Sequence, residues 1–307
     1  MIKWEKKFLD YRLEEEKKVL KELEEHYEAA LAEVEKVLKK LDDDDPVFLP
    51  VVIRRREYQR YIKQQIEAAL DKLHANEYET IEEFVNDSYT DGFVGVMYSL
   101  HGQGIPLLLP VDRNLVVKAV QMETKLNKPL YESLGADTKK LQKVVVNEIN
   151  RGIIAGKMYS EIMRNIANAA KIPMKRARTI VRTEAGRVQE EATMDAARKS
   201  KKSGADVVKQ WNAILDAVTR LTHKRLDGQI REIDEPFEID GKKAMQPHGF
   251  GIAEEDINCR CTLLIRARAA MDKDELNVLR ERARKAGVDK SQEFEEFKKK
   301  YLDATKD

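Results

Sequence analysis

The stretch LEEEKKVLKELEEHYEAALAEVEKVLKKL, residues 13–41, decides the fold of the N-terminal part of this 307-residue chain. Apolar residues recur every seven positions along it, with a second apolar series between them, and residues 1–45 contain neither Gly nor Pro. The pattern predicts one long helix with a stripe of the coiled-coil type, on the order of 60 Å long at about 1.5 Å per residue.

Two interpretations of the stripe remain open. Either it packs on another helix of the same chain, or it is a seam for a partner or a second copy. A second helix is expected from Arg54 to about Leu73 and would allow a helical hairpin. In the second interpretation, the partner-binding residues are Leu13, Leu20, Leu23, Tyr27 and Val34.

The segment Gly92–Pro110 is the most glycine-rich and apolar part of the chain. Its composition argues against a long helix and favours a short buried strand pair over an apolar loop. Helical patterns then return over 112–202, with one helix over Asp137–Ile154, one over Ser160–Ala170, and a third that starts at Pro173.

After about residue 205, strand-like patterns replace helical ones. Strands are expected at Val207–Leu215, Ile230–Ile239 and Cys261–Arg266, followed by charged helix in two pieces around Gly287. The fold class is therefore mainly α: long N-terminal helices, then a small α+β unit and a charged helical tail. The expected segments are a helical N-terminal region (1–110), a helical region ending in a basic helix (111–204), the α+β unit (205–270) and the tail (271–307).

Overall composition excludes several classes of protein. Lys and Arg number 56 against 55 acids, so binding to nucleic acid or membrane through total charge is not expected. No apolar stretch approaches the roughly 20 residues of a membrane span, and the N-terminus lacks a secretory signal, so we expect no membrane insertion. Two cysteines cannot form a disulfide framework, which indicates a reducing compartment.

Charge is nevertheless unevenly distributed along the sequence. Lys171–Lys202 carries ten basic and four acidic residues, whereas Glu232–Asn258 carries eight acidic and two basic residues. The two segments either neutralise each other within the protein, or the basic helix contacts DNA phosphates. The candidate DNA-binding residues are Lys175, Arg176, Arg178, Arg182 and Arg187.

The sequence contains none of the common nucleotide-binding, zinc-protease, hydrolase or EF-hand motifs, and no catalytic residue is assigned. Two cysteines and two histidines in the C-terminal unit, Cys259, Cys261, His223 and His248, are candidate zinc ligands. The alternative is a pair of small buried cysteines beside a hydrogen-bonded histidine. Zinc is the only cofactor considered.

An enzymatic alternative uses the same unit. Asp216, Arg220 and His223 are suited to general acid–base and phosphate-binding roles in a nuclease or transferase, with Cys259 as a further reactive group. We treat this as the less favoured interpretation, because the sequence supplies no recognisable oxyanion or substrate site.

Five pieces in a fixed order carry a resemblance to a known family. The chain resembles the phage Mu protein F-like minor head, or head morphogenesis, family of tailed bacteriophages, in particular its longer siphophage members. The pieces are IVRTEAGRVQEEA (180–192), KQW (209–211), DAVTRLTHKRLDGQI (216–230), EPF (235–237) and INCRCTL (257–263).

This resemblance implies a structural protein rather than an enzyme. The expected role is a minor capsid protein that docks on the portal protein inside the procapsid and contacts double-stranded DNA or influences its packaging and ejection. Scaffold and major capsid proteins are further expected partners. The implied location is the virion, inside the head near the portal, after assembly in the host cytoplasm. A DNA-binding or scaffolding module without portal contact is a second alternative.

Overall fold

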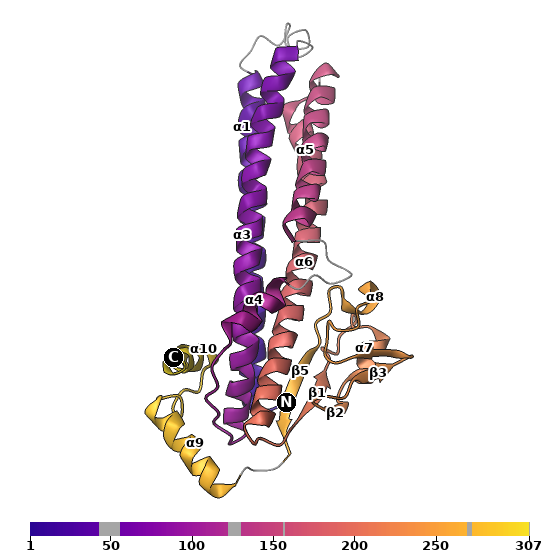
Figure 1. The fold of residues 1–307 in the computed structure, drawn as a ribbon. Helices are drawn as coiled ribbons and strands as arrows, with labels where there is room; N and C mark the ends of the chain where they lie inside the picture. The colour runs from indigo at the N-terminus through magenta and orange to yellow at the C-terminus, as the bar shows by residue number, and fades with distance from the viewer. Residues whose placement is uncertain (43–55, 122–129, 156, 269–271, 307) are drawn as a thin grey trace. The chain divides into compact units, whose positions relative to one another are not determined.

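The computed structural model describes residues 1–42, 56–121, 130–155, 157–268 and 272–306. The protein is mainly helical, with a small sheet unit near the C-terminus, as the sequence predicts. The helices are α1 (Lys3–Asp42), α3 (Arg56–Gly102), α4 (Arg113–Gln121), α5 (Leu130–Ile154), α6 (Tyr159–Lys202), α7 (Leu221–Leu226), α8 (Ala253–Asp256), α9 (Lys273–Lys285) and α10 (Phe294–Ala304). The strands are β1 (Val207–Asn212), β2 (Ile230–Glu232), β3 (Phe237–Ile239), β4 (Lys242–Ala244) and β5 (Thr262–Ala267) (Figure 1).

The residues form two compact units, each built from pieces far apart in the sequence. Unit 1 contains Met1–Lys17, Glu83–Leu126 and Ile180–Asp307, and unit 2 contains Lys18–Glu82 and Asn127–Thr179. Helices α1, α3 and α6 contribute residues to both units. None of the helices within the described ranges is long and apolar enough to cross a membrane.

Unit 2 packs segments of α1, α3, α5 and α6 around one apolar core. The α1 and α3 segments run antiparallel, because the hydroxyl of Tyr27 donates to Glu77 (3.0 Å) while the hydroxyl of Thr80 donates to the earlier residue Glu22 (2.8 Å). The predicted hairpin is therefore confirmed. The core residues are Tyr27, Ala30, Val34, Leu38, Ile62, Ile66, Leu70, Leu73, Leu141, Val145, Ile149, Ile162, Ile166 and Ala170.

This core accounts for most of the heptad stripe. Leu23, Tyr27 and Val34 are at most 4% exposed, and Tyr27 and Val34 belong to the chain's own core. These three side chains therefore offer no surface to a partner, since contacts within the chain already satisfy the helical periodicity. Leu13 is 38% exposed and Leu20 is half-buried, so they are the accessible members of the predicted partner-binding set.

Three sequence expectations about helices were wrong. The helix expected to end near Leu73 continues as α3 to Gly102. Gly92–Gly102 continues α3. Its glycines allow aromatic rings of α1 to pack directly on the α3 backbone: a Cβ at Gly95 would lie 2.3 Å from the ring of Phe8, and one at Gly102 would lie 2.3 Å from the ring of Trp4. Pro173 lies inside α6 rather than at a helix start. A proline costs a helix one backbone hydrogen bond, and buried residues on both sides, Ala170 and Ala177 among them, hold the helix continuous.

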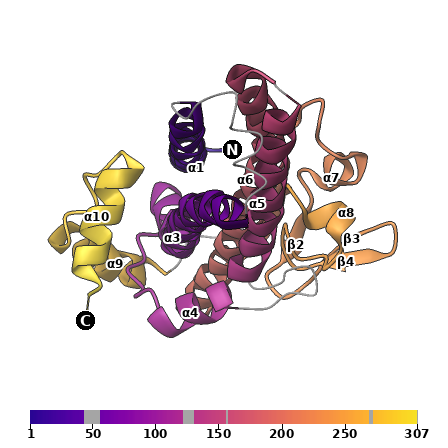
Figure 2. The same ribbon diagram turned by 90° about the horizontal axis from the view of Figure 1, so that it is seen from above.

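In unit 1 the strands form a three-stranded antiparallel sheet in the order β2-β1-β5 and a separate β3-β4 hairpin. The expected strand over Ile230–Ile239 is thus two short strands, interrupted around Pro236, while the other two expected strands correspond to β1 and β5. The tail forms two helices on either side of Gly287, as predicted. Seen from above, β2, β3 and β4 gather beside α7 and α8, and α9 and α10 lie apart from them (Figure 2).

Candidate functional site

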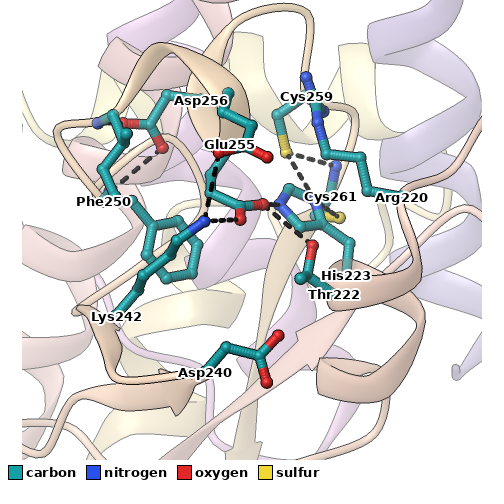
Figure 3. Close-up of polar contacts among 12 residues, drawn as sticks. Arg220, Thr222, His223, Asp240, Lys242, Phe250, Glu255, Asp256, Cys259 and Cys261 are labelled. Atoms are coloured by element: carbon teal, nitrogen blue, oxygen red, sulfur yellow. Dashed lines mark hydrogen bonds and ion pairs between the residues drawn. The ribbon is translucent and has the colours of Figure 1, made fainter.

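Three side chains from two separate segments converge in unit 1. Helix α7 supplies His223, and the turn between α8 and β5 supplies Cys259 and Cys261. His223 Nδ1 lies 3.2 Å from Cys261 Sγ and 3.5 Å from Cys259 Sγ, and all three side chains are at most 4% exposed (Figure 3). Their nitrogen and sulfur ligand atoms all lie within 4.8 Å of one another.

The backbone around α8 brings the two cysteines to this position. The carboxylate of Asp256 accepts hydrogen bonds from the backbone N–H groups of Phe250 (3.1 Å), Gly251 (2.6 Å) and Ile252 (3.2 Å), which ties down the loop before α8. Asn258 then adopts a left-handed conformation (φ 58°), which reverses the chain just before Cys259. The turn places both thiols on the side that faces α7.

A carboxylate lies on the other side of the histidine ring. Glu255 Oε2 is 3.3 Å from His223 Nε2, an ion-pair distance. Lys242 Nζ donates to the same carboxylate (2.6 Å), and so does the hydroxyl of Thr222 (2.9 Å); Figure 3 shows Glu255 between Lys242 and His223. Burial would raise the pKa of Glu255, but the hydrogen bonds from Lys242 and Thr222 outweigh burial and lower it. The carboxylate is therefore charged and held in place.

The two thiols affect each other directly. A hydrogen bond from Cys261 lowers the pKa of the Cys259 thiol well below its ordinary value, and the same bond raises the pKa of Cys261. The backbone N–H of Cys261 also points at Cys259 Sγ, at 3.4 Å. The two thiols therefore titrate as a coupled pair.

The fourth predicted ligand, His248, lies outside the three-residue group, which is the one such group among the described residues. His248 is 7% exposed and has a left-handed backbone (φ 61°). Its Nε2 lies against Gly186 of α6, where an added Cβ would be 2.5 Å away, so glycine at this position makes room for the ring. Burial lowers the pKa of His248, and the side chain is neutral near pH 7.

The residues of the enzymatic alternative have separate partners. Asp216 accepts two hydrogen bonds from Arg260 (2.6 and 2.8 Å) and one from Thr219 (2.8 Å), and these bonds lower its pKa to about 2. Arg220 donates to the backbone carbonyl of Ile257 (2.6 Å). Asp216 and Arg220 thus stabilise the backbone of two loops, while the ring of His223 points to the cysteines and Glu255.

Comparison with known proteins gives related sequences. The family model described as phage Mu protein F like protein matches residues 143–264, the region that contains this cluster. Residues 143–264 are a phage Mu protein F like region. The minor head protein GP7 of Bacillus phage SPP1 is 28% identical over 211 residues, which cover 65% of this chain and 68% of that protein.

A second relative of the chain has a different name. The NAD(+)--arginine ADP-ribosyltransferase EFV of Enterococcus faecalis is 34% identical over 208 residues, which cover 66% of this chain. The match spans only 42% of the length of that protein. No solved structure matches the chain.

The predicted DNA-binding residues all lie on α6, within the phage Mu protein F like region. Most of them form ion pairs or hydrogen bonds inside the protein. Arg176 pairs with Asp137, Arg178 with Glu24, and Arg182 with Glu16 and Asn258. Arg187 is 7% exposed and donates to Glu184 (3.1 Å) and to the carbonyl of Ala119 (3.0 Å). Lys175 and Arg176 are the two exposed members of the set.

Sequence reasoning missed two residues of the phage Mu protein F like region. Glu255 was counted only as part of an acidic stretch, although it is 2% exposed and its carboxylate lies 3.3 Å from Nε2 of the candidate ligand His223. Lys209 is fully buried in β1, and its ammonium donates to the carbonyls of Ile233 and Met245, each at 2.9 Å. A lysine within the apolar strand VVKQW was the available signal, because a charge at a buried strand position requires specific partners.

Proposed function

We propose that this protein is a minor component of a tailed-phage head that acts in head morphogenesis. The observation that carries the proposal is the similarity to the SPP1 minor head protein, which extends over about two thirds of both chains. The phage Mu protein F like region, matched independently, supports the same role. The proposed location is the virion interior after assembly in the host cytoplasm.

We infer further that the protein docks on the portal protein through an exposed apolar loop. Leu215, Val218 and Leu221 are 64%, 77% and 77% exposed, and all three lie within the matched region. Hydrogen bonds from Arg260 and Thr219 to Asp216 hold the loop in this conformation. A pre-ordered loop that presents apolar side chains loses little conformational entropy when a partner covers it.

Co-expression with a cognate portal protein, followed by size exclusion and mass measurement, tests this docking surface. The unaltered chain is expected to co-elute with the portal at a defined stoichiometry. Replacement of Leu215, Val218 and Leu221 by serine should abolish co-elution without unfolding the protein, since the three side chains are exposed. Val278→Ser, a change at a 54% exposed residue of α9, is the matched control and should co-elute normally. Co-elution of the triple variant would contradict this surface, and separation of the unaltered chain would contradict portal docking.

DNA contact is a narrower proposal. It rests on Lys175 and Arg176, which are exposed, although Arg176 also pairs with Asp137; Arg182 and Arg187 are more buried and bind internal partners. We therefore expect a weak contact, with few phosphates neutralised, rather than the broad basic surface that the sequence suggests.

A transferase role is the alternative supported by the name of the Enterococcus relative. The His223–Cys259–Cys261 cluster itself does not favour that role. The cavities beside the His223–Cys259–Cys261 cluster measure about 60 and about 20 Å³, whereas a ligand of the size of NAD needs a cleft of several hundred Å³. Turnover of NAD by the purified chain in the presence of an arginine-containing acceptor would contradict the structural assignment.

A further inference from the structure

We propose that His223, Cys259 and Cys261 bind one zinc ion, with Glu255 as the residue that orients the histidine. The proposal begins with the chemistry of the donors. One imidazole nitrogen and two thiolate sulfurs are preferred ligands of zinc in proteins. All three side chains are buried in one small region, and two of them lie on the same turn.

The distances fit a metal-centred arrangement. Tetrahedral zinc with bonds of about 2.0–2.1 Å to nitrogen and about 2.3 Å to sulfur separates these ligand atoms by about 3.5–3.8 Å. The separations from His223 Nδ1 to the two sulfurs are 3.2 and 3.5 Å. The two nitrogen–sulfur separations therefore need to change by at most a few tenths of an ångström to admit an ion, and the sulfur–sulfur separation is below 4.8 Å.

Both sulfurs face the same nitrogen, Nδ1 of His223, as they would around a shared ion. Hydrogen bonds among the three side chains are the competing explanation, and the zinc measurement below decides between the two. A cation at the centre satisfies the nitrogen and both sulfurs together. Two thiolates also neutralise the charge of the ion, so the buried site carries no net charge.

Glu255 favours the form of the ring that the ion needs. Its carboxylate oxygen lies 3.3 Å from Nε2 without forming a hydrogen bond there, and this charge favours a proton on Nε2, which would free Nδ1 to face the sulfurs. Lys242 and Thr222 hold the carboxylate in turn. This is the carboxylate–histidine arrangement by which proteins orient metal-binding histidines.

The fourth coordination position is assigned to water. A cavity of about 20 Å³ is lined by His223 and Cys261 together with Arg220, and this volume holds one water molecule. His248 is not assigned as a ligand, because its ring lies against Gly186 and outside the group of converging atoms.

The zinc content of the full chain, purified without chelator in reducing buffer and measured by elemental analysis, tests the site. We expect about one zinc per chain in the unaltered protein. Cys259→Ser, Cys261→Ser and His223→Ala should each lose most of it. His248→Ala is the matched control, since it removes an equally buried histidine of the same unit, and it should retain zinc. Glu255→Gln should retain zinc but bind it about 10- to 100-fold more weakly in a chelator competition.

A second measurement needs no variant to fold. Cobalt(II) added to the metal-stripped, unaltered chain should give the near-ultraviolet absorption of cobalt–thiolate bonds together with the visible bands of four-coordinate cobalt. Zinc far below one per chain, with no thiolate absorption from added cobalt, would overturn the proposal. Loss of zinc from His248→Ala as complete as from His223→Ala would overturn the three-ligand assignment.

Discussion

The two units of this chain fill their interiors in different ways. The core of unit 2 consists of apolar side chains at helical spacing, from Tyr27 on α1 to Ala170 on α6. The interior of unit 1 includes buried polar and charged groups, among them Glu190, Lys209, His223 and Glu255, each at most 2% exposed. A buried charge must be matched by a specific partner, whereas an apolar core needs only the right volume and pattern. The apolar core of unit 2 thus tolerates many sequences, whereas the polar interior of unit 1 depends on individual residues.

The largest effect on stability is expected from a cavity in unit 2. Leu38 is fully buried in the helical core, and Leu38→Ala should lower the free energy of unfolding by about 2–5 kcal/mol. Val144→Ala, at a 40% exposed residue of α5, is the matched control and should cost less than about 1 kcal/mol. Urea denaturation measures both. Equal effects would mean that the helical core of unit 2 is not the source of its stability.

A pH-dependent effect is expected from one buried carboxylate in each unit. Burial raises the pKa of Glu190 in unit 1 and of Glu77 in unit 2 from an ordinary value near 4.5 to about 7. Because the folded state holds the proton more tightly than the unfolded state, each group lowers stability as the pH rises from about 4.5 to about 7. A full shift of this size corresponds to on the order of 3 kcal/mol, at about 1.36 kcal/mol per pKa unit.

Glu190→Gln and Glu77→Gln should each remove part of this pH dependence. Glutamine keeps an oxygen that can accept from the backbone N–H of Leu263 at position 190, or from the hydroxyl of Tyr27 at position 77. Urea denaturation at about pH 5 and about pH 8 should show a smaller loss of stability in each variant than in the unaltered chain. Unchanged pH dependence in both variants would show that other groups titrate in this range.

A smaller effect is expected from the buried lysine of unit 1. Lys209→Met keeps the apolar stem but leaves the carbonyls of Ile233 and Met245 without their donor, at a cost of about 1–3 kcal/mol. Lys202→Met, an exposed change at the end of α6, should be nearly neutral. If Lys209→Met proved neutral as well, the polar interior of unit 1 would be as permissive as the apolar core of unit 2.

These differences explain what the sequence could predict. The heptad stripe and the second apolar series identified the hairpin of unit 2, because a helix that packs on its neighbours repeats with a fixed period. Periodicity failed at Gly92–Gly102 and at Pro173, where close ring packing or core contacts override the local preferences of glycine and proline. The grouping of His223 with Cys259 and Cys261 was within reach of the sequence, but Glu255 was not, since a contact between α7 and α8 has no local signal.

The smallest effect concerns the charged surface, where the two units also differ. In unit 1, Arg182 and Arg187 are held by internal partners, whereas Lys175 and Arg176 in unit 2 are exposed. The logarithm of the DNA-binding constant falls linearly with the logarithm of the salt concentration, with a slope of about 0.9 per phosphate contact. Lys175→Ala combined with Arg176→Ala removes at most two contacts, so it should reduce this slope by at most about 1.8.

The matched control for this change is the double replacement of Lys139 and Lys140 by alanine, which removes two exposed charges from α5 of the same unit. Fluorescence anisotropy with labelled duplex DNA over a salt series measures the slope for both double variants. If the position of the charges matters, only the change at residues 175 and 176 lowers the slope, because phosphate contacts require the two cations to lie against the duplex. Equal losses from the two pairs would show that the DNA responds only to total charge, and the proposed contact on α6 would then be wrong.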